Sequence, residues 1–307
     1  RVCRETEAAP SRLPLRSSYL NRPKPCENFP KQSGKTNGSI LFCCRCRPLP
    51  VWEDPPKMFE RMTILGPGLL GASLGMAARA QKLVDETTVW ARRPEARAAC
   101  LEQDWCDRVE STIVTAVQKS DLVVVCTPVR HVESVLQEMV GHITSSGLIT
   151  DVGSVKGAIC QAAETAFFST NSATFIGSHP MAGSEKGGMK HARPELFEGR
   201  PCFVTPGPDS PSKQVDLIRT FWEKLGMTVT QVEPAEHDAI VAHLSHLPHA
   251  LASCLAHALA GQPPNWGKHA GQGLRDTTRI ASGDPALWEE IFSQNRASVL
   301  EALESHQ

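Results

Sequence analysis

Hydrophobic and polar positions alternate along residues 62–232 in a way that predicts strands and helices in turn. A short apolar run, Met62–Leu65, precedes a glycine-rich turn, and a helix of small residues follows to about Gln81. The stretch Asp121–Cys126 is almost continuously apolar, which is typical of a central parallel strand covered on both faces. We expect further strands at 87–90, 148–151, 175–177, 202–205 and 228–232, and further helices at 95–102, 131–140 and 211–224. This alternation predicts right-handed βαβ units and an α/β fold with a doubly wound sheet.

The pattern changes after Pro234, beyond which only helical periodicity remains. Residues 235–259, 268–282 and 285–304 are all predicted to be helical. We therefore place a boundary near residue 233. It separates a dinucleotide-binding, Rossmann-type domain at 58–232 from an all-helical domain at 233–307.

Residues 1–57 differ from the rest in being rich in Pro, Arg and Cys, without hydrophobic periodicity. We interpret them as a disordered or non-native leader, translated upstream of a start at Met58 or Met62. A transit or regulatory tail is one alternative, although Glu5, Glu7 and Glu27 count against a transit peptide. A metal-binding tail is another, but Cys43-Cys-Arg-Cys46 lacks the two spaced cysteine pairs of a zinc site.

Composition narrows the class of protein. Apolar residues make up 41% of the chain, enough for a core, and no run approaches the roughly 20 residues that span a bilayer. Residues 58–307 carry 21 Lys and Arg against 28 Asp and Glu, a balance that argues against a nucleic-acid partner. Their six scattered cysteines indicate reduced core thiols. We expect a cytoplasmic protein that binds neither membrane nor nucleic acid.

The glycine-rich turn is Gly66-Pro67-Gly68-Leu69-Leu70-Gly71, between an apolar strand and a helix. In that context it predicts dinucleotide binding. Gly66 permits the tight turn, Gly68 lets the backbone approach a pyrophosphate, and Gly71 allows close packing of helix and strand. The helix N-terminus supplies N–H donors for the phosphates. A packing turn without a ligand is the alternative.

The end of the second strand bears on the choice of cofactor. NAD sites usually carry an acid there, whereas this chain reads Trp90-Ala-Arg92-Arg93. Because an arginine can pair with a 2′-phosphate, we expect NADP to be favoured over NAD; two solvated arginines are the alternative. At the ends of later strands, Thr127 and Pro128 are expected to line the cofactor cleft, and Asp151 to contribute to it.

The most informative polar segment is Ser178-His-Pro-Met-Ala-Gly-Ser-Glu-Lys186, after the expected strand 175–177. It places His179 at a strand exit, inside a glycine-bracketed loop. A nicotinamide-type site and a positioned histidine in one domain indicate hydride transfer coupled to proton transfer. Ser154 is expected near a helix N-cap at the same edge of the sheet, where it either simply caps the helix or serves the histidine loop.

The helical half holds five clustered histidines but no carboxylate at ligand spacing, so we expect no metal there. Arg275 and Arg279 lie within one turn of a helix start, an arrangement suited to a dianionic acid. Surface ion pairs are the alternative.

Several motifs occur together in a fixed order. They are Gly66-x-Gly-x-x-Gly71, Asp151-x-Gly-Ser-Val-Lys156, Ser178–Lys186, His237-Asp238, Ser245-His-Leu-Pro-His249, Asp276-x-Thr-Arg-Ile-Ala281 and Asp284-Pro-x-x-Trp288. Together they resemble the prephenate/arogenate dehydrogenase family of tyrosine biosynthesis, over roughly residues 62–296.

The resemblance implies a reaction and site residues. Hydride would leave C4 of prephenate for NAD(P), and loss of CO₂ would make the ring aromatic, giving 4-hydroxyphenylpyruvate. It also implies a homodimer formed through the helical domain. His179 would hold the 4-hydroxyl proton, with Ser154 as its hydrogen-bonding partner. The substrate contacts implied are Arg279 at a carboxylate, His246 in the pocket, Trp288 near it, Ser184, and Arg275 as a candidate for side-chain selection.

The chain departs from the family pattern in its leader, in the missing acid after the second strand, and in ending 19 residues after Trp288. We therefore expect the last dimerisation helices to be absent.

Two other classes remain to be weighed. A related hydroxyacid or imine reductase would rely on a lysine in the helical half, where only Lys268 occurs. A redox-sensing NADP-binding regulator would need the glycine turn but not Ser154, His179, His246 and Arg279 together.

Overall fold

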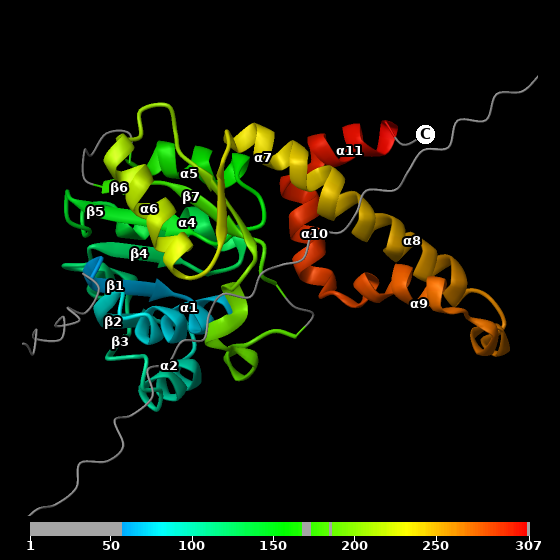
Figure 1. Ribbon diagram of the computed structural model, residues 1–307, viewed down its shortest axis with the longest axis horizontal. Helices are drawn as coiled ribbons and strands as arrows, with labels where there is room; N and C mark the ends of the chain where they lie inside the picture. Colours follow the sequence, from blue (N-terminus) through cyan, green and yellow to red (C-terminus); the bar gives the residue numbers. More distant parts are fainter. Residues whose placement is uncertain (1–56, 168–172, 184–185, 306–307) are drawn as a thin grey trace, which may run out of the picture. The chain divides into compact units, whose positions relative to one another are not determined.

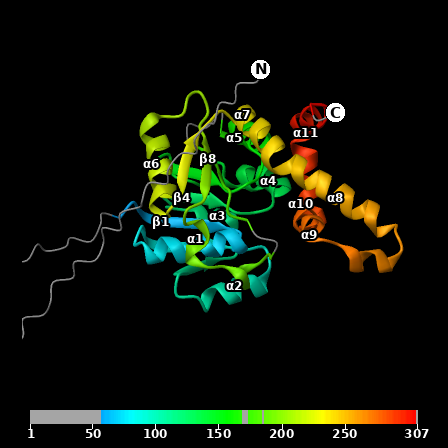
Figure 2. The same ribbon diagram turned by 45° about the vertical axis from the view of Figure 1, so that its right-hand side comes forward.

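The computed structural model describes residues 57–167, 173–183 and 186–305. The predictions for residues 1–56 and for Ser184 lie outside the described residues. Figures 1 and 2 show a strand-and-helix half and a helical half, in the order that the sequence predicts.

Six parallel strands form the main sheet, in the order β3-β2-β1-β4-β5-β6. They are β1 (Phe59–Leu65), β2 (Val84–Trp90), β3 (Arg108–Glu110), β4 (Leu122–Val125), β5 (Gly147–Asp151) and β6 (Ala173–Phe175). The chain reverses its direction of winding between β1 and β4, where Leu65 pairs with Val125. The loops after these two strands therefore lie side by side at the carboxyl edge, where doubly wound sheets bind dinucleotides. The predicted fold class is confirmed.

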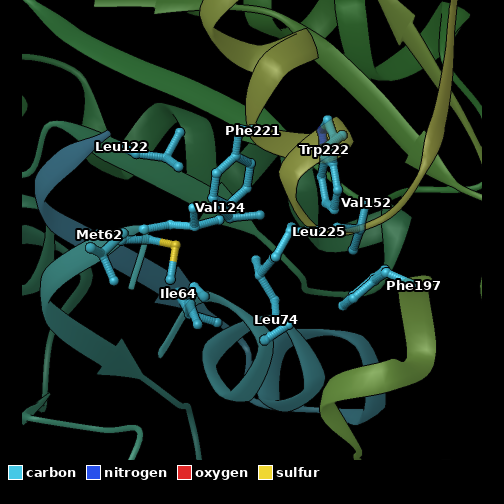
Figure 3. Close-up of a cluster of buried hydrophobic side chains, with 14 of the residues drawn as sticks. Met62, Ile64, Leu74, Leu122, Val124, Val152, Phe197, Phe221, Trp222 and Leu225 are labelled. Atoms are coloured by element: carbon cyan, nitrogen blue, oxygen red, sulfur yellow. The ribbon is translucent and has the colours of Figure 1, made fainter. Parts of the chain in front are cut away.

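Helices cover both faces of this sheet. They are α1 (Leu69–Ala80), α2 (Pro94–Leu101), α3 (Ile113–Val117), α4 (Val129–Met139), α5 (Gly157–Phe167) and α6 (Ser212–Lys224). One buried cluster joins β1 and β4 to α1 and α6, with Met62, Ile64, Leu74, Phe221 and Trp222 at its centre (Figure 3). A second cluster fills the opposite face, against α3, α4 and α5.

A smaller sheet was not expected. It contains β7 (Gly177–Pro180), β8 (Pro201–Thr205) and β9 (Thr228–Gln231), with β7 antiparallel to β8. Strand β6 ends at Phe175 and strand β7 begins at Gly177, so His179 lies within a strand. The sequence had predicted His179 in a loop that follows a strand. Short 3₁₀ turns, η1 (Met189–His191) and η2 (Pro194–Phe197), then lead to β8.

The helical half begins with α7 (Pro234–Val241), the π-helical segment η3 (Ala242–His246) and α8 (Leu247–Ala260). Together they form one continuous helix of 27 residues. Pro248 lacks an N–H and would clash with a regular preceding turn, which accounts for a π turn just before it. From the sequence we expected no apolar run long enough to span a membrane. This helix is long and apolar enough to do so, by length and composition only, and a third of its most apolar window is buried inside the structure.

The remaining elements are η4 (Pro264–His269), α9 (Gln272–Arg279), η5 (Ile280–Ser282), α10 (Pro285–Gln294) and α11 (Arg296–Glu304). The helix expected at 285–304 is broken at Asn295, which ends α10. Buried Ile291 of α10 belongs to the core cluster under α4 and α5, so side chains from beyond residue 233 complete a core of the sheet.

Candidate active site

A cleft of about 510 Å³ lies at the carboxyl edge, where β1, β2 and β4 end. Seven of the residues predicted to bind a cofactor line it, namely Gly66, Pro67, Gly68, Arg92, Arg93, Thr127 and Pro128. Arg130, His131 and Met189, which were not predicted, are among the other residues that line it.

The glycine turn has the geometry that a dinucleotide needs. Gly66 has φ of +101°, and a Cβ there would lie 3.0 Å from the Cys126 carbonyl oxygen. A Cβ on Gly71 would lie 2.3 Å from the Gly66 oxygen, so only glycine lets α1 start so close to β1. Gly68 faces open space, with no atom within 4 Å of a built Cβ. The buried Thr127 Oγ1 has no hydrogen-bond partner among the described residues. Open backbone and an unpaired hydroxyl at one edge fit a nicotinamide dinucleotide.

The other predicted cofactor residues lie elsewhere. Leu69 and Leu70 pack against the core cluster of α1, so only their backbone N–H groups, in the first turn of α1, are suited to phosphate. Asp151 is fully buried, and its Oδ2 is paired with the Lys156 ammonium group. Its Oδ1 accepts the Ser178 N–H at 3.0 Å. With its carboxylate closed from solvent, Asp151 links β5, the segment before α5 and β7, and it does not line the cleft. Its expected cofactor contact stays a prediction.

Two arginines project from the turn between β2 and α2. Arg92 and Arg93 are both exposed and both line the cleft. The guanidinium group of Arg97 donates to the Ala91 carbonyl at 2.7 Å and to the Arg92 carbonyl at 3.1 Å. Arg97 thus fixes the main chain of this turn while leaving both arginine side chains available.

Three side chains from two halves of the chain meet at His179. Its Nδ1 lies 2.8 Å from Nε2 of His237, on α7. Nδ1 of His237 lies 2.8 Å from Oδ1 of Asp238. His179 is 7% exposed and His237 is fully buried. Burial, reinforced by the nearby His237, Lys156 and His246, holds the pKa of His179 well below its usual value, so this imidazole is neutral at pH 7.

Asp238 also accepts the main-chain N–H groups of Lys156 at 2.7 Å and Gly157 at 2.9 Å, at the start of α5. The cap of this helix therefore comes from α7. Ser154, predicted near the N-cap and as the partner of His179, is partly buried and makes no hydrogen bond to His179. Sequence reasoning placed His237 and Asp238 in a motif but gave them no role, although a His-Asp pair beside a buried histidine was the available signal.

His246 lies on the π-helical segment and is 1% exposed. Asn295, at the break between α10 and α11, reaches it: the side-chain nitrogen lies 3.1 Å from His246 Nδ1 and donates to the Asp238 carbonyl at 2.8 Å. Burial lowers the pKa of His246 to about 4. Asn295 therefore links His246 to Asp238, which contacts His237 and through it His179.

Trp288 stacks on His249, with ring centroids 3.5 Å apart and planes 10° from parallel. It also meets His246 edge to face, at 6.0 Å. A Cβ on Gly283 would lie 2.5 Å from the Trp288 Nε1, so the glycine makes room for the indole. Trp288 is therefore beside His246, as its predicted role requires.

Arg275 and Arg279 lie on α9, which packs against α8. Both are exposed. Arg275 donates to the Ala270 carbonyl at 3.4 Å, and within the described residues neither guanidinium group contacts the histidines. Within this chain, the structure does not bring these two arginines to His179.

An acid on α10 contacts the start of α4. Glu290 Oε2 accepts from Arg130 Nη1 at 3.2 Å, and Oε1 accepts the Arg130 main-chain N–H. The glutamate side chain is 5% exposed. This contact, which the sequence did not indicate, fixes the helical half beside the cofactor cleft through a helix N-terminus.

Comparison with known proteins bears on this arrangement. Residues 74–231 match the family of prephenate dehydrogenase nucleotide-binding domains, and residues 233–307 match the prephenate dehydrogenase dimerization domain. The chain is 30% identical to the prephenate dehydrogenase of Bacillus subtilis, over 80% of this chain and 67% of that one. It is 29% identical to the cyclohexadienyl dehydrogenase of Zymomonas mobilis, over 80% of this chain and 85% of that one.

Two of the similar solved structures belong to enzymes of known activity. The prephenate dehydrogenase of Aquifex aeolicus, in complex with hydroxyphenyl propionate and NAD⁺, superposes with a TM-score of 0.74 at 29% identity, covering 80% of this chain and 86% of that one. The arogenate dehydrogenase of Synechocystis gives 0.70 at 28% identity, covering 80% and 87%.

Proposed function

The chain belongs to the prephenate dehydrogenase family, and we propose that within it His179 is the acid–base residue and NADP the preferred cofactor. It is a nicotinamide-dependent oxidoreductase that oxidises and decarboxylates prephenate or its amino analogue arogenate, a step of tyrosine biosynthesis. The observation that carries the residue assignment is that His179, buried and neutral at pH 7, is paired with His237 in the same chain that forms the cleft at the glycine turn.

The chemistry divides between cofactor and protein. The bound nicotinamide would supply the acceptor for the hydride from C4 of the substrate. His179, neutral at pH 7, would accept the 4-hydroxyl proton through its free ring nitrogen. Loss of the ring carboxylate as CO₂ then makes the ring aromatic. Ser154, partly buried in the β5–α5 loop, would hydrogen-bond the substrate hydroxyl or His179 once substrate is present.

The choice of NADP rests on the turn after β2. No carboxylate occurs in Trp90–Arg93, and two exposed arginines border the cleft. A guanidinium group can donate two parallel hydrogen bonds to a phosphate oxygen pair, which the ribose hydroxyl of NAD does not offer.

The substrate pocket would be formed by His246 and Trp288, with Arg279 holding a carboxylate common to both substrates and with Arg275 and Ser184 as further contacts. Arg279→Ala should then raise KM for both substrates on the order of 10–100-fold, with kcat largely retained. Steady-state kinetics check this, with Arg296→Ala on α11 as the matched control. A tenfold fall in kcat at constant KM would instead place Arg279 at the transition state.

We also propose a homodimer formed through the helical half. Exposed apolar side chains gather there, at Leu244, Leu251, Leu255, Leu259 and Trp266. The six cysteines among the described residues are free thiols, which fits the cytoplasm.

The test of the function is turnover of the purified chain with prephenate and with arogenate, each against NADP and NAD. We expect formation of the reduced nicotinamide with at least one acid, and a higher kcat/KM with NADP than with NAD. Turnover of neither acid would overturn the reaction, and a tenfold preference for NAD would overturn the reading of Arg92 and Arg93.

A further inference from the structure

The three side chains at His179 constrain where its proton can be. His179 Nδ1 and His237 Nε2 are 2.8 Å apart, and His237 Nδ1 and Asp238 Oδ1 are 2.8 Å apart. Each contact is short enough to be a hydrogen bond, so each needs one donor and one acceptor.

Asp238, the last of these three side chains, decides which atom is the donor in each hydrogen bond. Burial would raise the pKa of Asp238, but hydrogen bonds from His237 and from the Lys156 and Gly157 N–H groups outweigh burial and lower it. Asp238 is therefore a carboxylate, which can only accept. Burial lowers the pKa of His237, so at pH 7 its ring carries a single proton. That proton must lie on Nδ1, facing Asp238, and Nε2 of His237 is an acceptor. It follows that Nδ1 of His179 is the donor, and that Nε2 of His179 carries the lone pair.

We infer that His237 and Asp238 are positioning residues that hold His179 as its Nδ1–H tautomer, with the Nε2 lone pair free for the substrate hydroxyl. This inference rests on the proposed function for its consequence, but not for the tautomer itself. When the hydroxyl O–H bond breaks, the proton forms an N–H bond at Nε2. The positive charge of the imidazolium is then linked to the Asp238 carboxylate through His237.

The surroundings keep this arrangement rigid. His237 is fully buried, and Phe203 of β8 meets its ring edge to face, with centroids 5.2 Å apart. Asp238 is held by two N–H groups of α5, and its own carbonyl accepts from Asn295. The hydrogen-bonded series Asp238–His237–His179, called the relay below, therefore runs from α7 to β7 between groups that the fold holds in place.

The tautomer can be measured without substrate. Chain labelled with ¹⁵N-histidine would give long-range ¹H–¹⁵N spectra at pH 7.5, with His179→Asn identifying the His179 signals. We expect a protonated Nδ1 and an unprotonated Nε2. In His237→Phe, which keeps a buried ring but offers no acceptor, the protonated nitrogen should shift at least partly to Nε2.

Kinetics supply the second measurement. Asp238→Asn places an amide donor toward His237 and should reverse both hydrogen bonds, lowering kcat by on the order of 10²–10⁴, as such a change does behind other catalytic histidines. His237→Phe should lower kcat by on the order of 10²-fold, and His237→Gln, whose side-chain oxygen can accept from His179, should recover most of that loss. His243→Phe, an exposed histidine on the same helix, is the matched control and should behave as the parent.

The double variant His237→Phe/Asp238→Asn distinguishes positioning from a loss of folding. Because Asp238 acts through His237, adding Asp238→Asn to His237→Phe should cost less than a further threefold in kcat. The relay would be overturned if the falls in kcat of the two single variants multiplied in the double variant. A parent spectrum with the His179 proton on Nε2 would also overturn it. A parent spectrum with Nδ1–H but no turnover of either acid would uphold the relay and overturn the proposed function.

Discussion

A histidine closed from water favours its neutral form, because burial penalises the imidazolium ion more than the imidazole. His179 and His246 are both almost fully buried, and the pKa of each is lowered chiefly by burial. At the scale of single residues, this burial leaves His179 unprotonated at neutral pH, which is the form that can accept a proton.

His179→Asn tests this residue directly. Loss of the proton acceptor should lower kcat by on the order of 10²–10⁴, while the Kd for NADP changes little, because His179 does not line the cofactor cleft. Steady-state kinetics and a fluorescence titration with NADPH would measure the two effects. His257→Asn, at an exposed position on α8, serves as the control. Activity within a few-fold of the parent would remove His179 from its role.

The second prediction concerns stability and pH. The pKa of His246 is about 4 in the folded chain against 6.5 as its ordinary value, so between these values the unfolded state binds more protons. The free energy of unfolding therefore falls as pH drops below 6.5, and one such histidine accounts for about 1–2 kcal/mol between pH 7 and pH 5. Protonation of Nδ1 would also break its contact with Asn295.

Urea unfolding at pH 7 and pH 5 would measure this dependence. His246→Gln should be less sensitive to the change of pH than the parent by that amount, whatever its stability at pH 7. An equal loss of stability in parent and variant would show that His246 does not titrate as its burial requires.

At the scale of elements, two local breaks from regular structure build the site. The π turn at Ala242–His246 brings His246 to the buried face of the long helix, and the break at Asn295 lets its amide reach both His246 and Asp238. The turn between β2 and α2, by contrast, keeps its functional candidates exposed. Arg97 holds its main chain, and the two arginines beside it stay exposed at the cleft.

Arg92→Asp with Arg93→Ala should reverse the preference of this turn. The new carboxylate repels a 2′-phosphate and can accept from ribose hydroxyls, so KM for NADP should rise at least tenfold more than KM for NAD. Kinetics with both cofactors at saturating substrate would test this. Equal changes in the two KM values would mean that the arginines do not contact the 2′-phosphate. Arg108→Ala on β3 is a matched surface control.

At the scale of the whole molecule, the two halves share a core and a set of polar contacts. Ile291 completes the hydrophobic cluster under α4, and Glu290 caps that helix. Asp238 caps α5 in the same manner. The residues described from 57 to 305 therefore fall within a single compact unit.

The exposed apolar positions of α8 predict association. Leu251, Leu255 and Leu259 recur every four residues and are each at least 37% exposed. Leu255→Glu should place a charge in the proposed dimer interface, so the chain should sediment as a monomer where the parent sediments as a dimer. Leu101→Glu, at a 64% exposed position on α2, should leave the dimer intact. A parent that is monomeric at micromolar concentration would contradict the proposed interface.

The sequence by itself determined most of the order of elements, the doubly wound sheet and the glycine turn, because these follow from local periodicity and from backbone conformations that only glycine adopts. It also identified His179, His246 and Trp288 as residues of interest. It missed the short elements β3 and α3 and the separate sheet of β7, β8 and β9. It did not indicate that Asp151 pairs with Lys156 in the interior, because nothing local records that contact.

Only the tertiary structure decided what surrounds His179. Its contact with His237 joins residues 58 positions apart, and the link from Asn295 to Asp238 spans 57. Such pairings depend on how α7 and α10 pack against the sheet, which no local pattern records. The burial that makes these histidines neutral is likewise a property of the packed molecule, because it comes from every element that excludes water from them.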